Sequence, residues 1–302
     1  MSSAVMDAVK EAVMEGPLLR PGHTNCAGCG MSIGLQWLDE VMSEQRPYLV
    51  IPAACAIVTA GAFPTTSYGV PTLASTFASA PAFATGVSVV AELNGDEHPT
   101  VCWAGDGGTY DIGMATLSAA AERNEDILYV CYDNEIYGNT GGQRSSATPE
   151  GAVTSTTPRG KVERKKDIVA IMAAHRIPYA ATLSVAHRDD FLRKMRIARD
   201  TRGFRFLVML SPCPIGWKSS SDESVELIDL AVRSGLFPLY EVFDGERYTI
   251  NVRPDGTDLR EYLARQRRYT GSSLHIDIAR ERIASQWRTL ESRASFVPAS
   301  QG

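Results

Sequence analysis

Short apolar runs alternate along most of the chain with longer stretches in which apolar residues recur at helical spacing. The apolar runs predict strands over residues 48–52, 100–104, 127–132, 178–183 and 204–210. The stretches between them predict helices over residues 77–93, 112–123, 167–175 and 187–201, and a further helix followed by a loop over residues 1–35. Strands that alternate with helices form a parallel sheet covered on both faces. The sequence therefore predicts an α/β fold.

The pattern changes after residue 221. The remaining elements are predicted as helices over residues 222–234, 256–266 and 278–294, and a hairpin from Leu239 to Val252 that turns at Asp244-Gly245. We therefore expect an α/β domain over residues 1–220 and a C-terminal α+β extension over residues 221–302 that packs on a partner subunit.

Two segments are expected to lack regular structure. A Gly-, Pro-, Ser- and Thr-rich crossing loop spans residues 59–76, and a second loop spans residues 134–160. The second loop is too long for a simple connection, so we expect a cofactor to order it.

Composition and charge exclude several classes of protein. A chain of 302 residues with 44% hydrophobic content can bury one substantial core. The net charge of −5 argues against a nucleic-acid-binding surface, and the basic stretches 159–166 and 260–268 are interpreted as solvated faces and turns. No apolar run reaches membrane-spanning length, and residues 1–20 lack the apolar centre of an export signal, which predicts a cytoplasmic protein. Six cysteines in such a protein point to reduced thiols or metal ligands.

Two glycine-rich turns follow consecutive predicted strands. Gly105-Asp106-Gly107-Gly108 ends one strand, and the block DNEIYGNTGGQ begins at Asp133 after the next. Glycines let backbone N–H groups approach phosphate oxygens closely, and carboxylate and amide oxygens suit Mg2+. The 26 residues between Gly107 and Asn134 suffice for one helix and one strand, so Asp106 and Asn134 should leave neighbouring strands at one edge. The pattern predicts a site for a divalent cation and a diphosphate; a pair of ordinary turns is the alternative.

The cysteines form a second candidate site. The turn Cys26-Ala27-Gly28-Cys29 is typical of a dithiol redox site, half of a zinc site or half of an iron–sulfur site. Cys102 and Cys131 lie inside apolar strands and are interpreted as core residues. Cys55 and Cys213 each follow a predicted strand and should reach the ligand edge of the sheet. Spacing alone does not choose iron over zinc.

The order of these motifs resembles the thiamine diphosphate-binding β subunit of pyruvate:ferredoxin oxidoreductase and its 2-oxoacid:ferredoxin oxidoreductase relatives. The resemblance rests on GDG followed by 26 residues and an Asn, on the CxxC pair and Cys55, and on the DNEIYGNTGGQRS and PCPIGW blocks. It implies a parallel-sheet thiamine diphosphate-binding (PP-type) domain and oxidative decarboxylation of a small 2-oxoacid to acyl-CoA and CO2. Because an iron–sulfur cluster can take up the released electrons one at a time and pass them to ferredoxin, the pairing with thiamine favours iron over zinc.

The resemblance also implies roles for individual residues. The [4Fe-4S] ligands would be Cys26, Cys29, Cys55 and Cys213. Mg2+ would be bound by Asp106, Asn134 and the carbonyl of Ile136. The other cofactor-binding residues would be Gly105, Gly107, Gly108 and Thr140. Asn139 would be a catalytic residue that donates a hydrogen bond to an oxygen of the substrate or intermediate, although an ordinary turn residue is the alternative. His23 would either tune the cluster or serve as a structural loop residue.

Partner subunits follow from the same resemblance. Thiamine enzymes need a second domain that binds the aminopyrimidine and supplies a catalytic Glu, and a chain of this length has no room for it. We therefore expect an α subunit that supplies this domain. Further γ/δ-type subunits would carry CoA-binding or ferredoxin-like clusters, because the chain lacks a C-x2-C-x2-C-x3-C run. Ferredoxin and coenzyme A would be the remaining partners, and either basic stretch could dock acidic ferredoxin or the CoA phosphates.

The chain also departs from the pattern of pyruvate enzymes. Ala53-Ala54 precedes Cys55 where Thr-Gly is usual, and residues 76–81 read TFASAP where an acidic residue and an Asn are expected. These differences leave the cofactor ligands intact and concern the substrate. Pyruvate is the expected substrate, with oxalate or another small 2-oxoacid as the alternative. A non-oxidative thiamine carboligase or decarboxylase and a zinc-stapled structural subunit are the other hypotheses.

Overall fold

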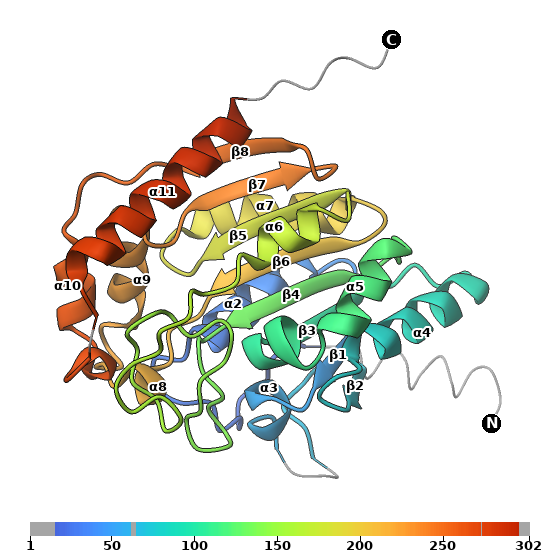
Figure 1. The fold of residues 1–302 in the computed structure, drawn as a ribbon. Coiled ribbons are helices and arrows are strands. Elements are labelled where there is room, and N and C mark those ends of the chain that lie inside the picture. The colour runs from blue at the N-terminus through green and yellow to red at the C-terminus, as the bar shows by residue number, and fades with distance from the viewer. Residues whose placement is uncertain (1–15, 62–64, 273, 296–302) are drawn as a thin grey trace.

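A single eight-stranded sheet organises the computed structural model, which describes residues 16–61, 65–272 and 274–295 (Figure 1). Its strands lie in the order β2-β1-β3-β4-β6-β5-β7-β8. The first six strands are parallel, whereas β7 runs antiparallel to β5 and β8 antiparallel to β7. The strands are β1 (Tyr48–Pro52), β2 (Thr72–Ser75), β3 (Thr100–Gly105), β4 (Leu128–Asp133), β5 (Tyr179–Ser184), β6 (Arg205–Leu210), β7 (Leu239–Phe243) and β8 (Arg247–Val252). The predicted α/β fold is confirmed.

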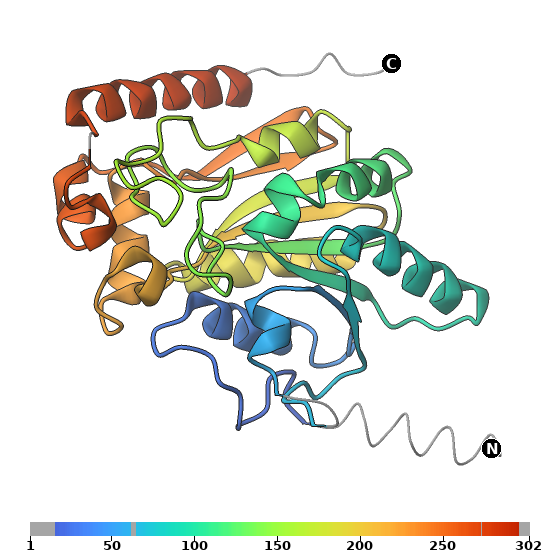
Figure 2. The same cartoon turned by 60° about the horizontal axis from the view of Figure 1, so that its bottom comes forward.

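Helices cover both faces of this sheet (Figure 2). The longer ones are α2 (Gly30–Val41), α4 (Ala80–Leu93), α5 (Met114–Glu122), α7 (Arg188–Asp200), α9 (Ser224–Arg233) and α11 (Ile276–Ala294). The shorter ones are α3 (Cys55–Val58), α6 (Ile168–Ala173), α8 (Pro214–Trp217), α10 (Leu259–Ala264), the π-helical turn η1 (Gly107–Asp111) and the 3-10 turn η2 (Arg267–Tyr269). The helices α2 and α7 pack on one face, and α4, α5, α6 and α11 pack on the other.

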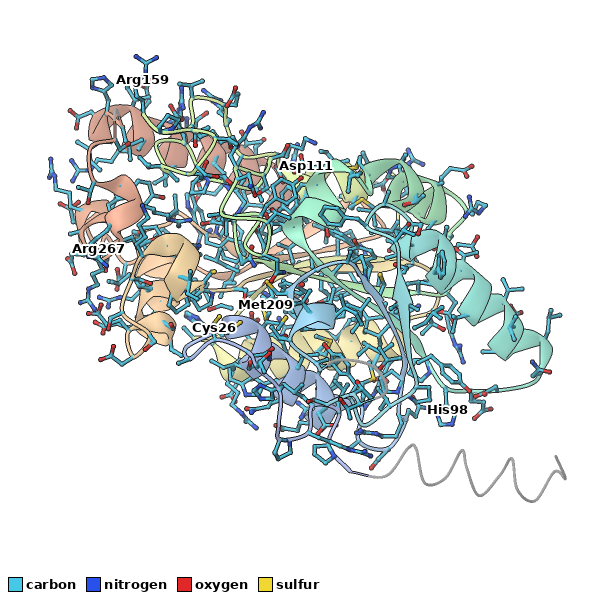
Figure 3. The ribbon with its side chains drawn as sticks, turned by 90° about the horizontal axis from the view of Figure 1, so that it is seen from below. Cys26, His98, Asp111, Arg159, Met209 and Arg267 are labelled. Atoms are coloured by element: carbon cyan, nitrogen blue, oxygen red, sulfur yellow. The ribbon has the colours of Figure 1, made fainter. Side chains whose placement is uncertain are left out.

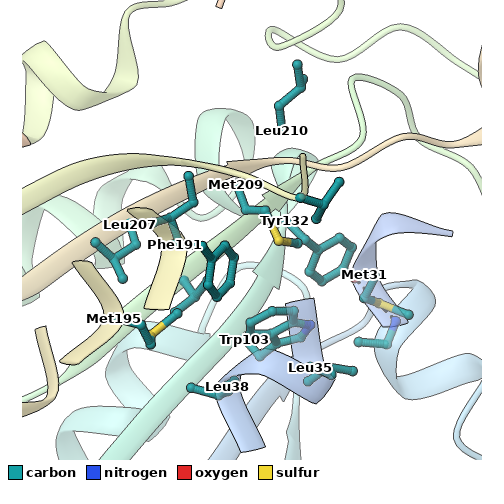
Figure 4. Close-up of a cluster of buried hydrophobic side chains, with 14 of the residues drawn as sticks. Met31, Leu35, Leu38, Trp103, Tyr132, Phe191, Met195, Leu207, Met209 and Leu210 are labelled. Carbon is teal, nitrogen blue, oxygen red and sulfur yellow. Dashed lines mark hydrogen bonds between the residues drawn. The ribbon is translucent and has the colours of Figure 1, made fainter. Parts of the chain in front are cut away.

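Alternate residues of the central strands separate the two cores. In β3, Val101 and Trp103 belong to the core under α2 and α7, while Cys102 and Ala104 belong to the core under α4 and α5. Figure 4 shows the first core, in which Trp103 lies between residues of α2 and the side chain of Tyr132. All these strand residues are fully buried, which explains why β3 reads as a continuous apolar run.

Several predicted boundaries need correction. The helix expected within residues 1–35 falls largely on residues 1–15, outside the described residues, and the helix that the structure does show, α2, begins only at Gly30. The crossing loop predicted over residues 59–76 contains β2, so that prediction was wrong for Thr72–Ser75. β2 escaped notice because it is a short edge strand without a buried face. The long loop is confirmed and extends to residue 167.

The C-terminal segment continues the same sheet. The hairpin β7–β8 turns at Asp244 and Gly245, as predicted, with φ of 55° and 73°. α11 crosses over this hairpin, and its Trp287 and Leu290 side chains join the core that contains Tyr240. The division into domains at residues 220 and 221 stays a prediction. None of the helices in the described ranges has the length and apolar character needed to cross a membrane.

Lys194 gives the fold a predicted pH dependence. This lysine of α7 is fully buried, donates to the Thr182 carbonyl at 3.0 Å and pairs with Asp190 at 2.6 Å. Burial lowers its pKa to about 8, against the attraction of Asp190. Between pH 8 and 10.5 the unfolded chain therefore holds a proton that the folded protein lacks, so folding becomes more favourable as pH rises.

We expect the free energy of unfolding of the wild type to rise by about 3 kcal/mol relative to Lys194→Met between pH 8 and pH 10.5. Urea denaturation at several pH values measures this difference. Arg196→Met, whose side chain is 50% exposed on the same helix, should follow the wild type. A Lys194→Met curve that stays parallel to the wild type would show that Lys194 titrates normally.

Candidate functional site

Four adjacent strands end at one edge of the sheet with the residues predicted for the site. β1, β3, β4 and β6 lie side by side. Their carboxyl ends lead to Cys55, Asp106, Asn134 and Cys213 in that order. The register pairs Gly105 with Tyr132, so Asp106 and Asn134 leave neighbouring strands as predicted. In such parallel sheets the carboxyl edge is where ligands bind.

The first glycine-rich turn is packed against the second. A Cβ at Gly107 would lie 2.1 Å from Cε1 of Tyr137, and a Cβ at Gly108 would lie 3.4 Å from the Phe77 carbonyl oxygen. The Tyr137 hydroxyl donates to Asp111 at 2.7 Å and thereby fixes its ring over the turn. The chain after Gly107 forms the π-helical turn η1, and α5 begins at Met114, two residues later than predicted. These contacts bring the two sequence motifs together.

This packing predicts the effect of Gly107→Ala. The new methyl group would displace the Tyr137 ring, so we expect a lower Tm and weaker binding of thiamine diphosphate. Differential scanning fluorimetry and a fluorescence titration measure the two effects. In Gly86→Ala of α4 the methyl group would meet nothing within 4 Å, and this control should stabilise the protein by roughly 0.5–1 kcal/mol. Equal behaviour of the two variants would contradict the packing argument.

Asp106 is a buried carboxylate. Its side chain is 2% exposed and accepts a hydrogen bond from the Ser145 hydroxyl. Burial, with a smaller contribution from Asp133, raises the pKa of Asp106 well above its usual value. Asp106 forms no salt bridge with any of the described residues. A divalent cation would supply the missing positive charge, so the site fits the Mg2+ expected there.

The turn after β4 holds the other predicted Mg2+ ligands. Asn134 and Ile136 are 8% and 7% exposed, and the Asn134 side-chain oxygen accepts from the Ile136 N–H at 3.3 Å. Between them Glu135 adopts a left-handed conformation with φ of 64°. Glu135 forms ion pairs with Lys165 at 2.8 Å and Arg268 at 2.7 Å. Although burial alone would raise its pKa, these cations leave the pKa of Glu135 below its usual value.

The predicted cluster ligands lie on three loops that contact one another. Cys26 and Cys29 lie in the loop that leads into α2, where Figure 3 labels Cys26. The Gly30 N–H donates to the Pro212 carbonyl at 3.2 Å and joins this loop to the one that carries Cys213. Cys55 begins α3, and the Cys213 sulfur accepts from the Gly216 N–H at 3.4 Å. All four thiols are free.

The pKa values of Cys55 and Cys213 are raised. Burial raises the pKa of Cys55 to about 11 and that of Cys213 to about 12, and Cys29 contributes to both shifts. A buried thiol with a raised pKa stays protonated at neutral pH. A bound metal centre would stabilise its thiolate form. The described residues contain no group of three or more His, Cys, Asp or Glu side chains arranged to hold a metal ion. Cys102 and Cys131 are fully buried core residues, as predicted.

Asn139 connects the two parts of the site. Its side-chain N–H group donates to the Cys55 sulfur at 3.1 Å. Asn139 and Thr140 are exposed, and Thr140 bonds to Gln143 within the same turn. No sequence pattern predicted the contact between Asn139 and Cys55. His23 remains within its own loop, where its Nδ1 accepts from the Asn25 N–H at 3.4 Å.

Two basic stretches contain buried cations, which corrects their interpretation as solvated faces. Lys161 and Arg268 are each 2% exposed. Lys161 donates to the carbonyls of Ser146 and Thr148, and Lys165 lies 2.6 Å from Asp133. These cations hold the long loop and the turn after β4 through protein contacts.

Comparisons with known proteins agree with this geometry. Residues 54–209 match the thiamine pyrophosphate enzyme, C-terminal TPP binding domain. The ketoisovalerate oxidoreductase subunit VorB of Pyrococcus abyssi is 39% identical over 288 residues, which cover 90% of this chain and 92% of the relative. The pyruvate synthase subunit PorB of Methanothermobacter marburgensis is 40% identical over 264 residues, which cover 85% and 91%.

A solved structure shares the fold. A chain of the 2-oxoglutarate:ferredoxin oxidoreductase from Magnetococcus marinus superposes with a TM-score of 0.61 at 21% identity, covering 89% of this chain and 94% of that one. The family model and the two subunits named above show a closer relationship than this solved structure, because their sequences also match. The chain therefore belongs to the thiamine diphosphate-binding β subunits of the 2-oxoacid:ferredoxin oxidoreductases.

Proposed function

We propose that this β subunit takes part in the oxidative decarboxylation of a small 2-oxoacid, with pyruvate as the preferred substrate. In the overall reaction, the 2-oxoacid and coenzyme A give acyl-CoA, CO2 and a proton. Two electrons pass singly through a [4Fe-4S] cluster to two oxidised ferredoxins. The observation that carries the proposal is the convergence of Cys55, Asp106, Asn134 and Cys213 at the ends of four adjacent strands.

The cofactor would be held by the two glycine-rich turns. Asp106, Asn134 and the Ile136 carbonyl would bind Mg2+, and Gly105, Gly107, Gly108 and Thr140 would surround the diphosphate. When bound, thiamine diphosphate supplies a nucleophilic carbon for the keto group and accepts the bonding electrons as CO2 leaves. The buried position of Asp106 would strengthen the attraction of its carboxylate for the cation.

The cluster would be held by Cys26, Cys29, Cys55 and Cys213. The contact between Asn139 and the Cys55 sulfur supports a short route from the cofactor turn to the cluster. A hydrogen bond to a cluster ligand would also tune the reduction potential. In this setting Asn139 would act both toward the substrate, as its motif implies, and toward the cluster.

The assignment of a 2-oxoacid as the substrate class rests on the relatives, and the preference for pyruvate rests on the resemblance of the motifs to those of pyruvate:ferredoxin oxidoreductase. The subunits named for ketoisovalerate and for pyruvate are 39% and 40% identical to this chain, so identity alone does not separate the two substrates. The non-oxidative carboligase, the zinc-stapled subunit and oxalate oxidation remain the alternatives to test. An α subunit with a pyrimidine-binding domain and a catalytic Glu, γ/δ-type subunits, ferredoxin and coenzyme A complete the proposed cytoplasmic system.

Metal analysis of the complex tests the proposal. The protein is purified without oxygen together with its co-purifying subunits, and iron, acid-labile sulfide, zinc and the visible spectrum are measured. A [4Fe-4S] cluster in this subunit predicts four irons and four sulfides beyond those of the partners, and a visible band that bleaches when a 2-oxoacid and CoA are added. Bleaching rates with pyruvate, 3-methyl-2-oxobutanoate and oxalate rank the substrates. Zinc in place of iron would overturn the electron-transfer function.

A further inference from the structure

Arg268 lies at the centre of a buried set of polar contacts. Its Nη2 donates to Glu135 at 2.7 Å and to the Tyr262 hydroxyl at 3.1 Å, and its Nε donates to Gln266 at 2.9 Å. The side chain is 2% exposed although it comes from the short turn η2 near the end of the chain. A guanidinium buried to this extent needs each of these partners, because an unpaired buried charge is costly.

Arg268 also stacks on the loop that carries Cys213. Its guanidinium lies 4.2 Å from the centre of the Trp217 ring, a cation–π contact shielded from water. Trp217 is fully buried and ends α8, the helix that Cys213 caps. The Trp217 indole N–H donates at 2.9 Å to the backbone carbonyl of Asn134. Arg268 is therefore linked to the turn Asn134–Ile136 in two ways. It contacts Glu135 directly, and it stacks on Trp217, which donates to the Asn134 carbonyl.

The Cys213 loop also packs directly against the turn Asn134–Ile136. A Cβ at Gly216 would lie 2.8 Å from Cγ2 of Ile136, so the loop after Cys213 rests directly on one of the proposed Mg2+ ligands. Lys218 follows Trp217 in a left-handed conformation, and its carbonyl accepts from the Arg267 N–H at 3.3 Å. The turn η2 thus contacts the Cys213 loop through Arg267 and the turn Asn134–Ile136 through Arg268.

The backbone conformation of Glu135 also supports a positioning role for Arg268. A non-glycine residue in the left-handed region costs about 1 kcal/mol or more, and the surroundings must hold it there. The two ion pairs of Glu135, to Arg268 and Lys165, provide that restraint. Because Asn134 and Ile136 flank Glu135, its conformation sets the direction of both their ligand atoms.

We infer that Arg268 is a positioning residue that fixes the turn Asn134–Ile136 against the Cys213 loop and so sets the arrangement of the Mg2+-thiamine diphosphate site relative to the cluster. This inference rests on the proposed function. It assigns a role at the site to the C-terminal segment, which the sequence motifs do not reach. Arg268 acts through its contacts with Glu135 and Trp217.

The test compares Arg268→Gln with Arg268→Lys in the complete complex, purified with its partner subunits and depleted of cofactor. Titration with thiamine diphosphate and Mg2+ gives the Kd, and Tm is measured on the same samples. We expect Arg268→Gln to weaken binding about tenfold, a typical coupling between contacting groups. Arg268→Lys should recover only part of the loss, since lysine can pair with Glu135 but lacks the planar guanidinium that stacks on Trp217. Arg260→Gln, whose side chain is 60% exposed in the same basic stretch, is the control.

A double-mutant cycle separates positioning from simple stability. Trp217→Phe keeps a ring under the guanidinium but removes the hydrogen bond to the Asn134 carbonyl. If Arg268 acts through Trp217, the effects of Arg268→Gln and Trp217→Phe on the Kd will be clearly less than multiplicative in the double variant. Multiplicative effects, or a lower Tm with an unchanged Kd in Arg268→Gln, would overturn the inference. A wild-type complex that fails to bind thiamine diphosphate would instead overturn the proposed function.

Discussion

Cys213→Ser should abolish reduction of ferredoxin while leaving thiamine diphosphate bound. Serine suits this position structurally, because Cys213 is the N-cap of α8 and its side chain accepts from the Gly216 N–H. Serine is a preferred N-cap residue, so the helix and the Trp217 contact should survive. What the variant loses is a thiolate, the ligand that iron–sulfur clusters require. The measurements are iron content, the visible spectrum, 2-oxoacid-dependent ferredoxin reduction and thiamine diphosphate affinity.

The control for this variant is Cys102→Ala. Cys102 lies within β3 and is fully buried in the core beneath α4 and α5. Its loss should cost about 1 kcal/mol of stability and leave iron content and turnover close to those of the wild type. Undiminished ferredoxin reduction by Cys213→Ser would mean that electrons do not pass through this cysteine, as the non-oxidative alternative requires.

Asp106→Asn is expected to weaken binding of Mg2+ and thiamine diphosphate by more than about 100-fold, because loss of a direct metal ligand should exceed the effect of losing a residue that only supports one. Isothermal titration of the cofactor-depleted complex measures the affinity. Asp277→Asn, which removes a carboxylate that is 90% exposed, should bind like the wild type. Tight binding by Asp106→Asn would remove Asp106 from the metal site.

The same substitution should stabilise the protein in the absence of cofactor. Because burial raises the pKa of Asp106, the folded protein holds this proton at pH values where the unfolded chain has released it. The contribution of Asp106 to stability is therefore complete below the unfolded pKa of about 3.9 and is lost as pH rises through the folded value. The Tm advantage of Asp106→Asn should grow with pH above about 4 and disappear when saturating cofactor is added to the wild type.

The sequence was most informative where burial is uniform. Strands such as β3 and β4 are buried on both faces, and their continuous apolar runs made them recognisable. The spacing between Gly107 and Asn134 then placed Asp106 and Asn134 on neighbouring strands. By contrast, β2 has no fully buried residue, so a sequence pattern cannot distinguish it from the surrounding loop.

Charged residues were the main source of error at the site. Arg268 lies in a run of arginines that resembles a solvated face, and its partner Glu135 is 133 residues away in the sequence. No periodicity connects them. A useful signal was nevertheless present, because an acidic residue between two predicted metal ligands requires a cation from elsewhere in the chain if the turn is buried.

Completion of the site must wait until most of the chain has been synthesised. The strand order places β6 next to β4, so the edge that holds Asn134 remains incomplete until residue 210 has left the ribosome. Cys213 follows shortly afterwards, and Arg268 arrives only with the last eighth of the chain. Cofactor and cluster would therefore be loaded only after most of these elements have been synthesised.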